Sequence, residues 1–227
     1  MSNTLYTGNR NYSSWSLRPW LVLKWAGIPF AEHEIRLDQP GYGGGSIAEI
    51  LKISPTGRVP CLHAGNIVIW DSLAIAEWAA EEKPDAQLWP AGRAQRAKAR
   101  SVVAEMHSGF ADVRRQLTMN IRRRCPPQDW EPATRAQLAR IDQVWTELCT
   151  ANKSSGPWLF GRRGIADAFY APVATRMRTY GVQLSPVAQA WCDTVFADAA
   201  FREWETAAQP DSWDKPGYPV IDKLHSR

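Results

Sequence analysis

The chain has 227 residues and a mass of 25.5 kDa, which is enough for one large domain or two small ones. Its composition, 44% hydrophobic and 22% charged, is typical of an ordinary globular protein, and no apolar run approaches the roughly 18 residues that a membrane-spanning helix needs. The net charge of +4 arises from 27 basic and 23 acidic residues, an excess too small to indicate nucleic-acid binding. We therefore expect neither nucleic acid nor a membrane as a partner.

The four cysteines, Cys61, Cys125, Cys149 and Cys192, are far apart in the sequence. They form neither a Cys-x-x-Cys pair nor a cluster with histidines at metal-ligand spacing, so no metal site and no disulfide framework are predicted. Residues 1–5 contain no basic stretch followed by an apolar one, so we expect no signal peptide and predict a cytoplasmic location.

Residues 1–84 alternate strand-like and helix-like patterns. The predicted elements are a strand at 4–6, a helix over 17–25 that ends at Gly27, a strand over 31–37, a Gly-rich loop at 39–45, a short helix over 47–53, strands over 59–63 and 66–70, and a helix from Ser72 to about Glu82. The resulting order, β-α-β-α-β-β-α, is the thioredoxin-like arrangement.

Residues 90–208 are predicted to form an all-helical second domain. Apolar residues recur every three or four positions from about Arg93 to Arg124, which predicts one long amphipathic helix. Further helices are expected around 138–148, over 165–180 and from Pro186 onward. Residues 209–227, which contain three prolines, predict an irregular tail laid over the surface.

Two motifs in the first domain predict a site for a short extended ligand with an anionic end. The turn residues Pro55 and Gly57 lead into an extended Arg58-Val59 segment, and Pro60 lacks a backbone N–H, so this edge stays open for pairing. Asp71-Ser72 stands just before an apolar-periodic stretch and therefore predicts a helix N-terminus, whose free amides and dipole favour a carboxylate.

A third motif, Ser13-Ser14-Trp15-Ser16-Leu17-Arg18, follows the first strand, where open α/β sheets place active sites. A serine hydroxyl beside the amides of a helix N-terminus can stabilise a thiolate. Pro19 belongs in a first helical turn, which favours Ser14 or Ser16 as the cap and leaves Ser13 facing a ligand. Ser-x-x-Ser cannot itself exchange protein thiols, because it forms no thiolate.

These motifs, in this order, resemble those of the glutathione transferase family, in particular its serine-type zeta and tau classes and some bacterial relatives. The resemblance covers nearly the whole chain and implies a thioredoxin-like N-terminal domain followed by an all-helical C-terminal domain. It also implies glutathione as co-substrate, no metal, a cis peptide bond before Pro60, and a structural helix cap at Asp167. Gly164 departs from the hydroxyl residue that usually begins this capping box.

The resemblance also implies roles for individual residues. Ser13 is expected to donate a hydrogen bond to the glutathione sulfur, with Ser14 and Asn11 as reserve donors. Glutathione-binding residues are expected to be Arg58, Val59, Asp71 and Ser72, with the last two at its γ-glutamyl end. The candidates for the second-substrate site are Trp15, Met106, Phe110 and Arg114.

The resulting expectation is a cytoplasmic, homodimeric glutathione transferase of the detoxification type. It would activate glutathione as a thiolate and add it to a small electrophile or reduce a peroxide with it. Two alternatives stay open. One is a zeta-type cis-trans isomerase of maleylacetoacetate-like compounds, which the Ser13-Ser14 start favours and the absence of a following cysteine disfavours. The other is a non-catalytic binding protein that keeps the fold without the chemistry.

Overall fold

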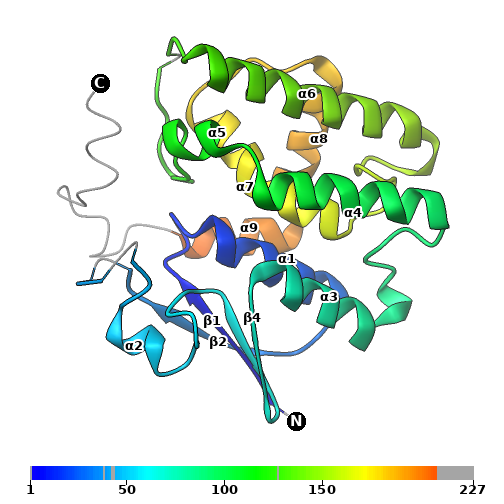
Figure 1. The fold of residues 1–227 in the computed structure, drawn as a ribbon. Coiled ribbons are helices and arrows are strands. Elements are labelled where there is room, and N and C mark those ends of the chain that lie inside the picture. Colours follow the sequence, from blue (N-terminus) through cyan, green and yellow to red (C-terminus); the bar gives the residue numbers. More distant parts are fainter. Residues whose placement is uncertain (1, 38, 42–43, 127, 209–227) are drawn as a thin grey trace.

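The computed structural model describes residues 2–37, 39–41, 44–126 and 128–208, and the tail expected over 209–227 lies outside the described residues. The elements are, in chain order, β1 (Asn3–Gly8), α1 (Ser14–Ala26), β2 (Ala31–Ile35), α2 (Ala48–Leu51), β3 (Cys61–Ala64), β4 (Ile67–Trp70), α3 (Ser72–Glu82), η1 (Pro84–Ala86), α4 (Arg93–Ser108), α5 (Ala111–Gln116), α6 (Pro132–Asn152), η2 (Lys153–Ser155), α7 (Ile165–Thr179), α8 (Pro186–Ala197) and α9 (Ala199–Ala207). Figure 1 shows the helical second half lying against α1 and α3.

The first half contains a four-stranded mixed sheet in the order β2-β1-β3-β4. β1 pairs in parallel with β2 and antiparallel with β3, which in turn pairs antiparallel with β4. Leu5 of β1 faces the main core with α1 and α3, whereas its neighbour Tyr6 packs with the smaller apolar cluster that includes Ile50 of α2. These elements confirm the predicted thioredoxin-like half and the all-helical half that follows.

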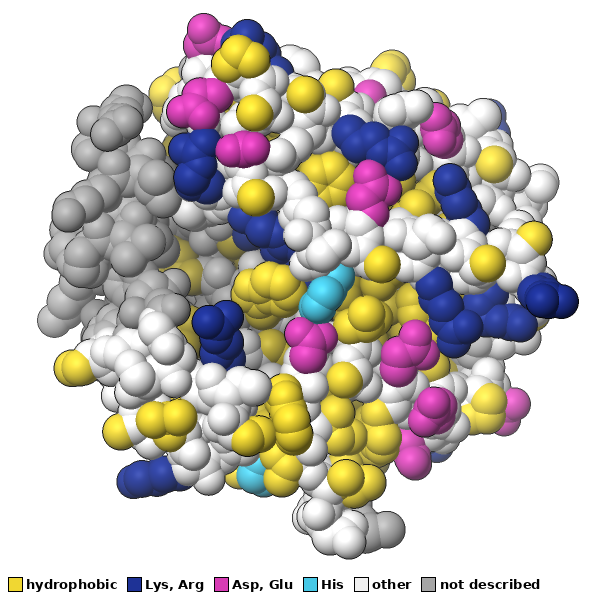
Figure 2. All heavy atoms as spheres, in the orientation of Figure 1, with side chains coloured by type: hydrophobic (Ala, Val, Ile, Leu, Met, Phe, Trp, Pro, Cys, Tyr) yellow, Lys and Arg dark blue, Asp and Glu magenta, His cyan; other side chains and the backbone are white. Residues whose placement is uncertain are grey.

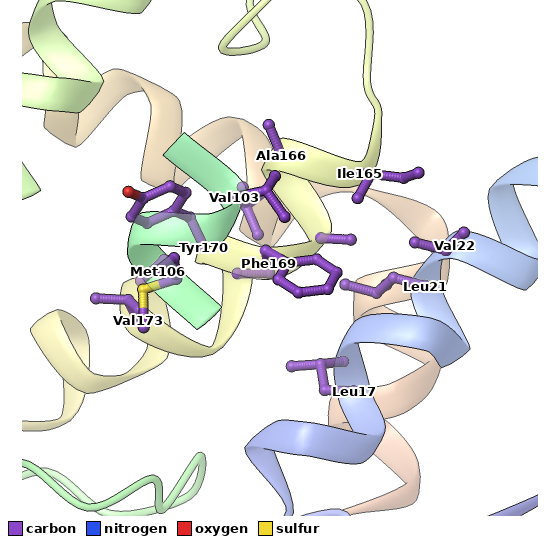
Figure 3. Packing of buried hydrophobic residues seen from close by; sticks show 14 of the residues in the cluster. Leu17, Leu21, Val22, Val103, Met106, Ile165, Ala166, Phe169, Tyr170 and Val173 are labelled. Carbon is purple, nitrogen blue, oxygen red and sulfur yellow. The ribbon is translucent and has the colours of Figure 1, made fainter. Parts of the chain in front are cut away.

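One continuous apolar core joins the two halves. Figure 3 shows Leu17 and Leu21 of α1 pointing toward Phe169 of α7, with Val103 of α4 on the other side of the ring. Full burial of one such side chain contributes about 1.5–3 kcal/mol, so the contact between α1 and α7 holds the two halves firmly together. Among the described residues, no helix is long and apolar enough to cross a membrane.

The prediction of one long helix over 93–124 is wrong. α4 and α5 are separated by a break at which Phe110 adopts a left-handed φ of 57°. Arg114 stabilises the break, because its guanidinium donates to the carbonyl oxygens of Gly109 (3.0 Å) and Met106 at the end of α4. The apolar spacing continues across the break because both segments bury one side against the same core.

Asp167 is fully buried and holds the start of α7. Its Oδ2 accepts the N–H of Gly164 (3.0 Å), and its Oδ1 accepts the N–H of Leu159 (3.0 Å) and the indole N–H of Trp191 (2.8 Å). The side chain therefore joins the helix start, the loop before it and α8.

Replacing Asp167 with alanine should lower the free energy of unfolding by about 2–4 kcal/mol, because three buried N–H donors lose their acceptor. Urea denaturation measures the change. Asp129→Ala is the matched control, since this carboxylate is 94% exposed and its loss should change stability by no more than about 0.5 kcal/mol. Equal stability of the two variants would contradict the proposed role of Asp167.

Candidate functional site

A cavity of about 530 Å³ opens at the carboxyl end of β1. It is lined by residues 12–15, Leu37, Gly41, Gly45, Ile47, Ile50, residues 56–60 and residues 70–72. The three sequence motifs therefore meet in one place, although they lie far apart in the chain. Of the seven first-domain candidates that it contains, Ser13, Ser14 and Trp15 come from the start of α1, Arg58 and Val59 from the loop before β3, and Asp71 and Ser72 from the start of α3.

The start of α1 presents two hydroxyl groups to this cavity. Ser13 is the N-cap: its Oγ accepts the N–H of Ser16 (3.4 Å) and donates to Ser16 Oγ (2.8 Å). The prediction that Ser14 or Ser16 caps the helix is wrong, because the Ser16 hydroxyl instead accepts the N–H of Gly8 (3.1 Å) and ties α1 to β1. Ser14 also lines the cavity, and its Oγ has no hydrogen-bond partner among the described residues.

The segment before β3 forms one wall of the cavity. The Val59–Pro60 peptide bond is cis, and β3 begins at Cys61 rather than at the predicted Val59. Because Pro60 has no N–H, the ladder with β1 cannot extend through it, and Val59 stays outside the sheet. Its backbone is therefore free of strand pairing where it borders the cavity, with the exposed Arg58 at the rim.

The start of α3 forms another end of the cavity. Asp71 caps the helix with an unusual left-handed φ of 73°, and its Oδ1 accepts the N–H of Leu73 (2.7 Å). Ser72 is 1% exposed, and within the described part of the chain its Oγ is buried with no hydrogen-bond partner. An unsatisfied buried hydroxyl costs about 1–3 kcal/mol. A ligand carboxylate at this helix N-terminus would satisfy both the hydroxyl and the free amides.

One residue of the second half, which the sequence did not single out, also reaches this end. His107 of α4 places its Nε2 3.4 Å from Asp71 Oδ2. Burial lowers the pKa of His107, Asp71 raises it, and the nearby Arg18 and Arg114 lower it further. The imidazole therefore favours its neutral form at pH 7. Nothing in the local sequence marks His107, because its partner is 36 positions away.

The candidates for a second-substrate site differ in their surroundings. Trp15 is 37% exposed and lines the cavity. Phe110 is 8% exposed, and Arg114 is half-buried with its guanidinium engaged by the carbonyl groups of α4. Met106 is fully buried beside Tyr170 in the core, so it presents no surface to a ligand (Figure 3).

Trp15 is surrounded by positive charge. The guanidinium carbon of Arg18 lies 4.3 Å from its ring centroid and that of Arg114 lies 4.9 Å away. Arg18 is fully buried, and in the described residues none of its three guanidinium nitrogens has a hydrogen-bond partner. Burial above all, and then Arg114 and Arg176, hold the pKa of Arg18 well below its usual value. This region therefore favours negative charge nearby.

Asn11, the reserve sulfur contact, is 3% exposed and is engaged with the second half of the chain. Its Nδ2 donates to Asn120 Oδ1 (3.0 Å), and its Oδ1 accepts the N–H of Arg122 (3.2 Å).

Among the described residues, no group of three or more His, Cys, Asp or Glu side chains could hold a metal ion. Taken together, the structure has a thioredoxin-like first half, an all-helical second half, and a cavity at the carboxyl end of β1 that is bordered by the N-termini of α1 and α3.

Comparison with protein-family models agrees with this class. The model described as "Glutathione S-transferase, N-terminal domain" matches residues 12–82, and "Glutathione S-transferase, C-terminal domain" matches residues 131–220. The chain belongs to the glutathione S-transferase family.

Individual relatives fall within the same family. A maleylpyruvate isomerase of Ralstonia sp is 27% identical over 219 residues, which are 92% of this chain and 99% of that protein. Glutathione S-transferase GstB of Escherichia coli strain K12 is 25% identical over 142 residues, 61% of this chain and 68% of its own. A Burkholderia glutathione transferase homologue with bound glutathione has a TM-score of 0.67 and 24% identity, over 92% of this chain and 98% of its own.

Proposed function

We propose that the protein binds glutathione in the 530 Å³ cavity and uses it, as a thiolate, to attack a small electrophile or to reduce a peroxide. The observation that carries the proposal is the joining, in one cavity, of three complementary parts. The hydroxyl groups of Ser13 and Ser14 face the thiol, the backbone of Val59 pairs with the extended peptide, and the partnerless hydroxyl of Ser72 takes the γ-glutamyl carboxylate. Arg58 at the rim contacts the glycyl end.

The hydroxyl groups at the start of α1 can activate the thiol without a general base. A thiol with a pKa near 8.5 is mostly protonated at pH 7, and lowering that pKa by about two units requires about 2.7 kcal/mol. One charge-assisted hydrogen bond, together with the dipole of α1, is sufficient. Ser14 can donate it directly, and Ser13 can donate it once its hydroxyl hydrogen turns from Ser16 Oγ to the sulfur. The thiol proton passes to water, and the sulfur then forms a bond to the electrophilic carbon while the leaving group departs with its bonding electrons. With a hydroperoxide, the sulfur attacks the outer oxygen, the O–O bond breaks and an alcohol leaves; a second glutathione then displaces water from the oxidised sulfur and forms the disulfide.

The start of α3 recognises the other end of glutathione. The Ser72 hydroxyl and the free amides of α3 bind the γ-glutamyl carboxylate, and the Asp71 carboxylate binds the ammonium group. Since His107 is neutral at pH 7, it orients Asp71 without neutralising it.

A second candidate is a glutathione-dependent cis-trans isomerase of an acidic maleyl compound. It is favoured by the relative named maleylpyruvate isomerase, which this chain matches over nearly its whole length. The positive charges of Arg18 and Arg114 around Trp15 suit an acidic second substrate. Trp15, however, stands where a cysteine would follow the two serines of the zeta class.

We also propose two domains, residues 1–84 and 90–208, a cytoplasmic location and a homodimer. Ile67, Val68 and Trp70 are exposed on β4, the edge strand of the sheet, and Val68 and Trp70 share one face of it. Figure 2 shows exposed hydrophobic side chains in this region. Burial of such a face between two copies would be favourable. Light scattering at micromolar concentration should give about twice 25.5 kDa, and a stable active monomer would refute the dimer.

A turnover screen with glutathione tests the reaction class. We expect consumption of glutathione with at least one haloaromatic compound or hydroperoxide. Turnover of a maleyl compound with no loss of glutathione would assign the isomerase activity instead. Retention on glutathione resin without turnover of any of the three classes would favour a binding protein.

Ser13→Ala should lower the rate of the glutathione reaction by about 10- to 1000-fold and change the glutathione KM little, because one donor to the thiolate is lost. Ser101→Ala, at an exposed position of α4, is the control and should match the wild type. A fully active Ser13→Ala variant beside an impaired Ser14→Ala variant would transfer the role to Ser14.

Ser72→Ala should raise the KM for glutathione by about tenfold and change kcat much less, because it removes a contact to the non-reacting end of the substrate. The ligand-free protein should lose no stability, since the hydroxyl that is removed has no partner within the described residues. Kinetics and urea denaturation measure the two effects. An unchanged KM, or a loss of stability without a change in KM, would rule out Ser72 as the carboxylate contact.

A further inference from the structure

The loop that presents Ser13 and Ser14 to the cavity is held in place by the second half of the chain. Within the loop, the carbonyl oxygen of Asn9 accepts the N–H groups of Tyr12 (3.1 Å) and Ser13 (2.9 Å). These two hydrogen bonds close a tight turn over residues 9–13. On the outside of this turn, the carbonyl of Arg10 accepts the indole N–H of Trp204 in α9 (3.0 Å). The Arg10 side chain also pairs with Glu32 (2.6 Å) and Glu34 (3.5 Å) of the first half. Asn11 makes a further set of contacts with the second half.

Asn11 is hydrogen-bonded to a short segment 109 residues away. Its Nδ2 donates to Asn120 Oδ1 (3.0 Å), its Oδ1 accepts the N–H of Arg122 (3.2 Å), and its backbone carbonyl accepts the N–H of Ile121 (3.3 Å). Three consecutive residues of the second half therefore hold one residue of the loop. The side chains of Asn11 and Asn120 are both buried, so water does not replace these hydrogen bonds at low cost.

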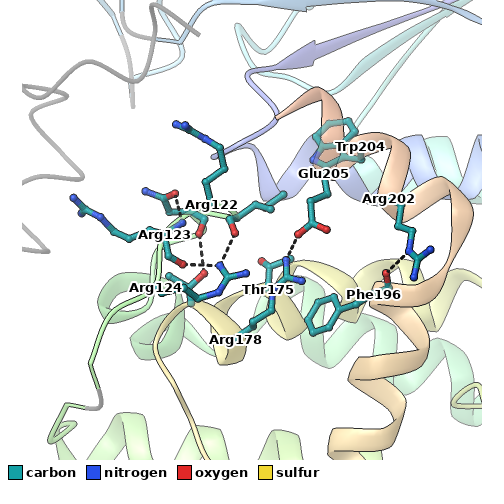
Figure 4. Close-up of polar contacts among 12 residues, drawn as sticks. Arg122, Arg123, Arg124, Thr175, Arg178, Phe196, Arg202, Trp204 and Glu205 are labelled. Carbon is teal, nitrogen blue, oxygen red and sulfur yellow. Dashed lines mark hydrogen bonds and ion pairs between the residues drawn. The ribbon is translucent and has the colours of Figure 1, made fainter. Parts of the chain in front are cut away.

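The segment that holds Asn11 is itself anchored to the core. Asn120 Oδ1 also accepts the N–H of Arg123 (3.2 Å), and its backbone carbonyl accepts the hydroxyl of Thr179 at the end of α7 (2.7 Å). Figure 4 shows residues 122–124 lying beside the end of α7, where Arg178 pairs with Glu205 of α9. The position of Asn120 is thus set by α7, the most buried helix of the second half.

We propose that Asn120 and Asn11 form an interdomain clamp, in which Asn120 is a positioning residue that fixes the hydroxyl groups of Ser13 and Ser14 relative to the thiol. The proposal rests on the proposed function, since it assigns the clamp to thiolate formation. A hydrogen bond to a thiolate depends steeply on distance and angle, so a displacement of the loop weakens it while the binding of the rest of glutathione is kept.

The hydrogen bonds also fix the orientation of the two carboxamides. Each Oδ1 accepts a backbone N–H, from Arg122 in one case and Arg123 in the other, so the amide nitrogen of Asn11 must be the donor between them. The same chemical change therefore has opposite effects at the two positions. Asn120→Asp keeps the accepting oxygen, whereas Asn11→Asp places two oxygens against each other.

The effect of the clamp is measured as the pKa of the bound glutathione thiol. This pKa is obtained from thiolate absorbance in a pH titration of the complex. We expect Asn11→Asp and Asn120→Ala to raise this pKa by about one unit and to lower turnover at pH 6.5 by about tenfold, with the glutathione KM changed no more than about twofold. Asn120→Asp should stay within about twofold of the wild type. Val144→Ala, a buried change in α6, controls for general destabilisation and should leave the thiol pKa unchanged.

Hydrogen exchange of the Tyr12 and Ser13 amides tests the clamp without glutathione. Asn120→Ala should speed their exchange by about tenfold, and Val144→Ala should speed it much less. The clamp would be overturned if Asn11→Asp and Asn120→Ala both kept the wild-type thiol pKa and slow amide exchange. It would also be overturned if Asn11→Asp and Asn120→Asp raised the thiol pKa by the same amount. If the wild type does not lower the thiol pKa, the proposed function and the catalytic role of the clamp fail, while the exchange result still decides whether the two residues hold the loop.

Discussion

The packing of α1 against α7 is the contact on which the rest of the structure depends. Leu17 and Leu21 of α1 meet Phe169 of α7 in a core that runs through both halves. The first turn of α1 carries the hydroxyl groups of the candidate site, and the far end of α7 anchors the segment that holds the preceding loop. In the clamp that we propose, the second half of the chain therefore decides where those hydroxyl groups point, although none of the described residues that line the cavity belongs to it.

The surroundings of the cavity carry separated charges. Two helix N-termini, those of α1 and α3, border it and favour negative charge at two points. Asp71 adds a single negative charge beside one of them, and its neutral neighbour His107 does not cancel that charge. Arg18, buried without a hydrogen-bond partner among the described residues, adds positive charge beneath Trp15. The ligand that we propose, an extended peptide with a thiolate, a carboxylate and an ammonium, matches this pattern.

Local patterns in the sequence predicted most elements, because each depends on neighbouring residues. The apolar period of α1, the left-handed Gly27 that ends it and the capping Asp71 are all local signals. The break between α4 and α5 was missed because the apolar period continues through it, while the carbonyl groups that it exposes are satisfied by Arg114 from the next turn. Ser13, rather than Ser14 or Ser16, caps α1 because the Ser16 hydroxyl is occupied by the N–H of Gly8.

The sequence by itself determined the order of the elements in the first half and the three motifs of the cavity, since turn residues, helix caps and apolar periods act over a few positions. The tertiary structure alone decided which side chains meet. His107 reaches Asp71, and Asn120 reaches Asn11, across more than thirty and more than a hundred positions. The tertiary structure also decided that Met106, a candidate for the second-substrate site, is buried in the core. Such pairings follow from how α4 and α7 pack against α1, which no local pattern records.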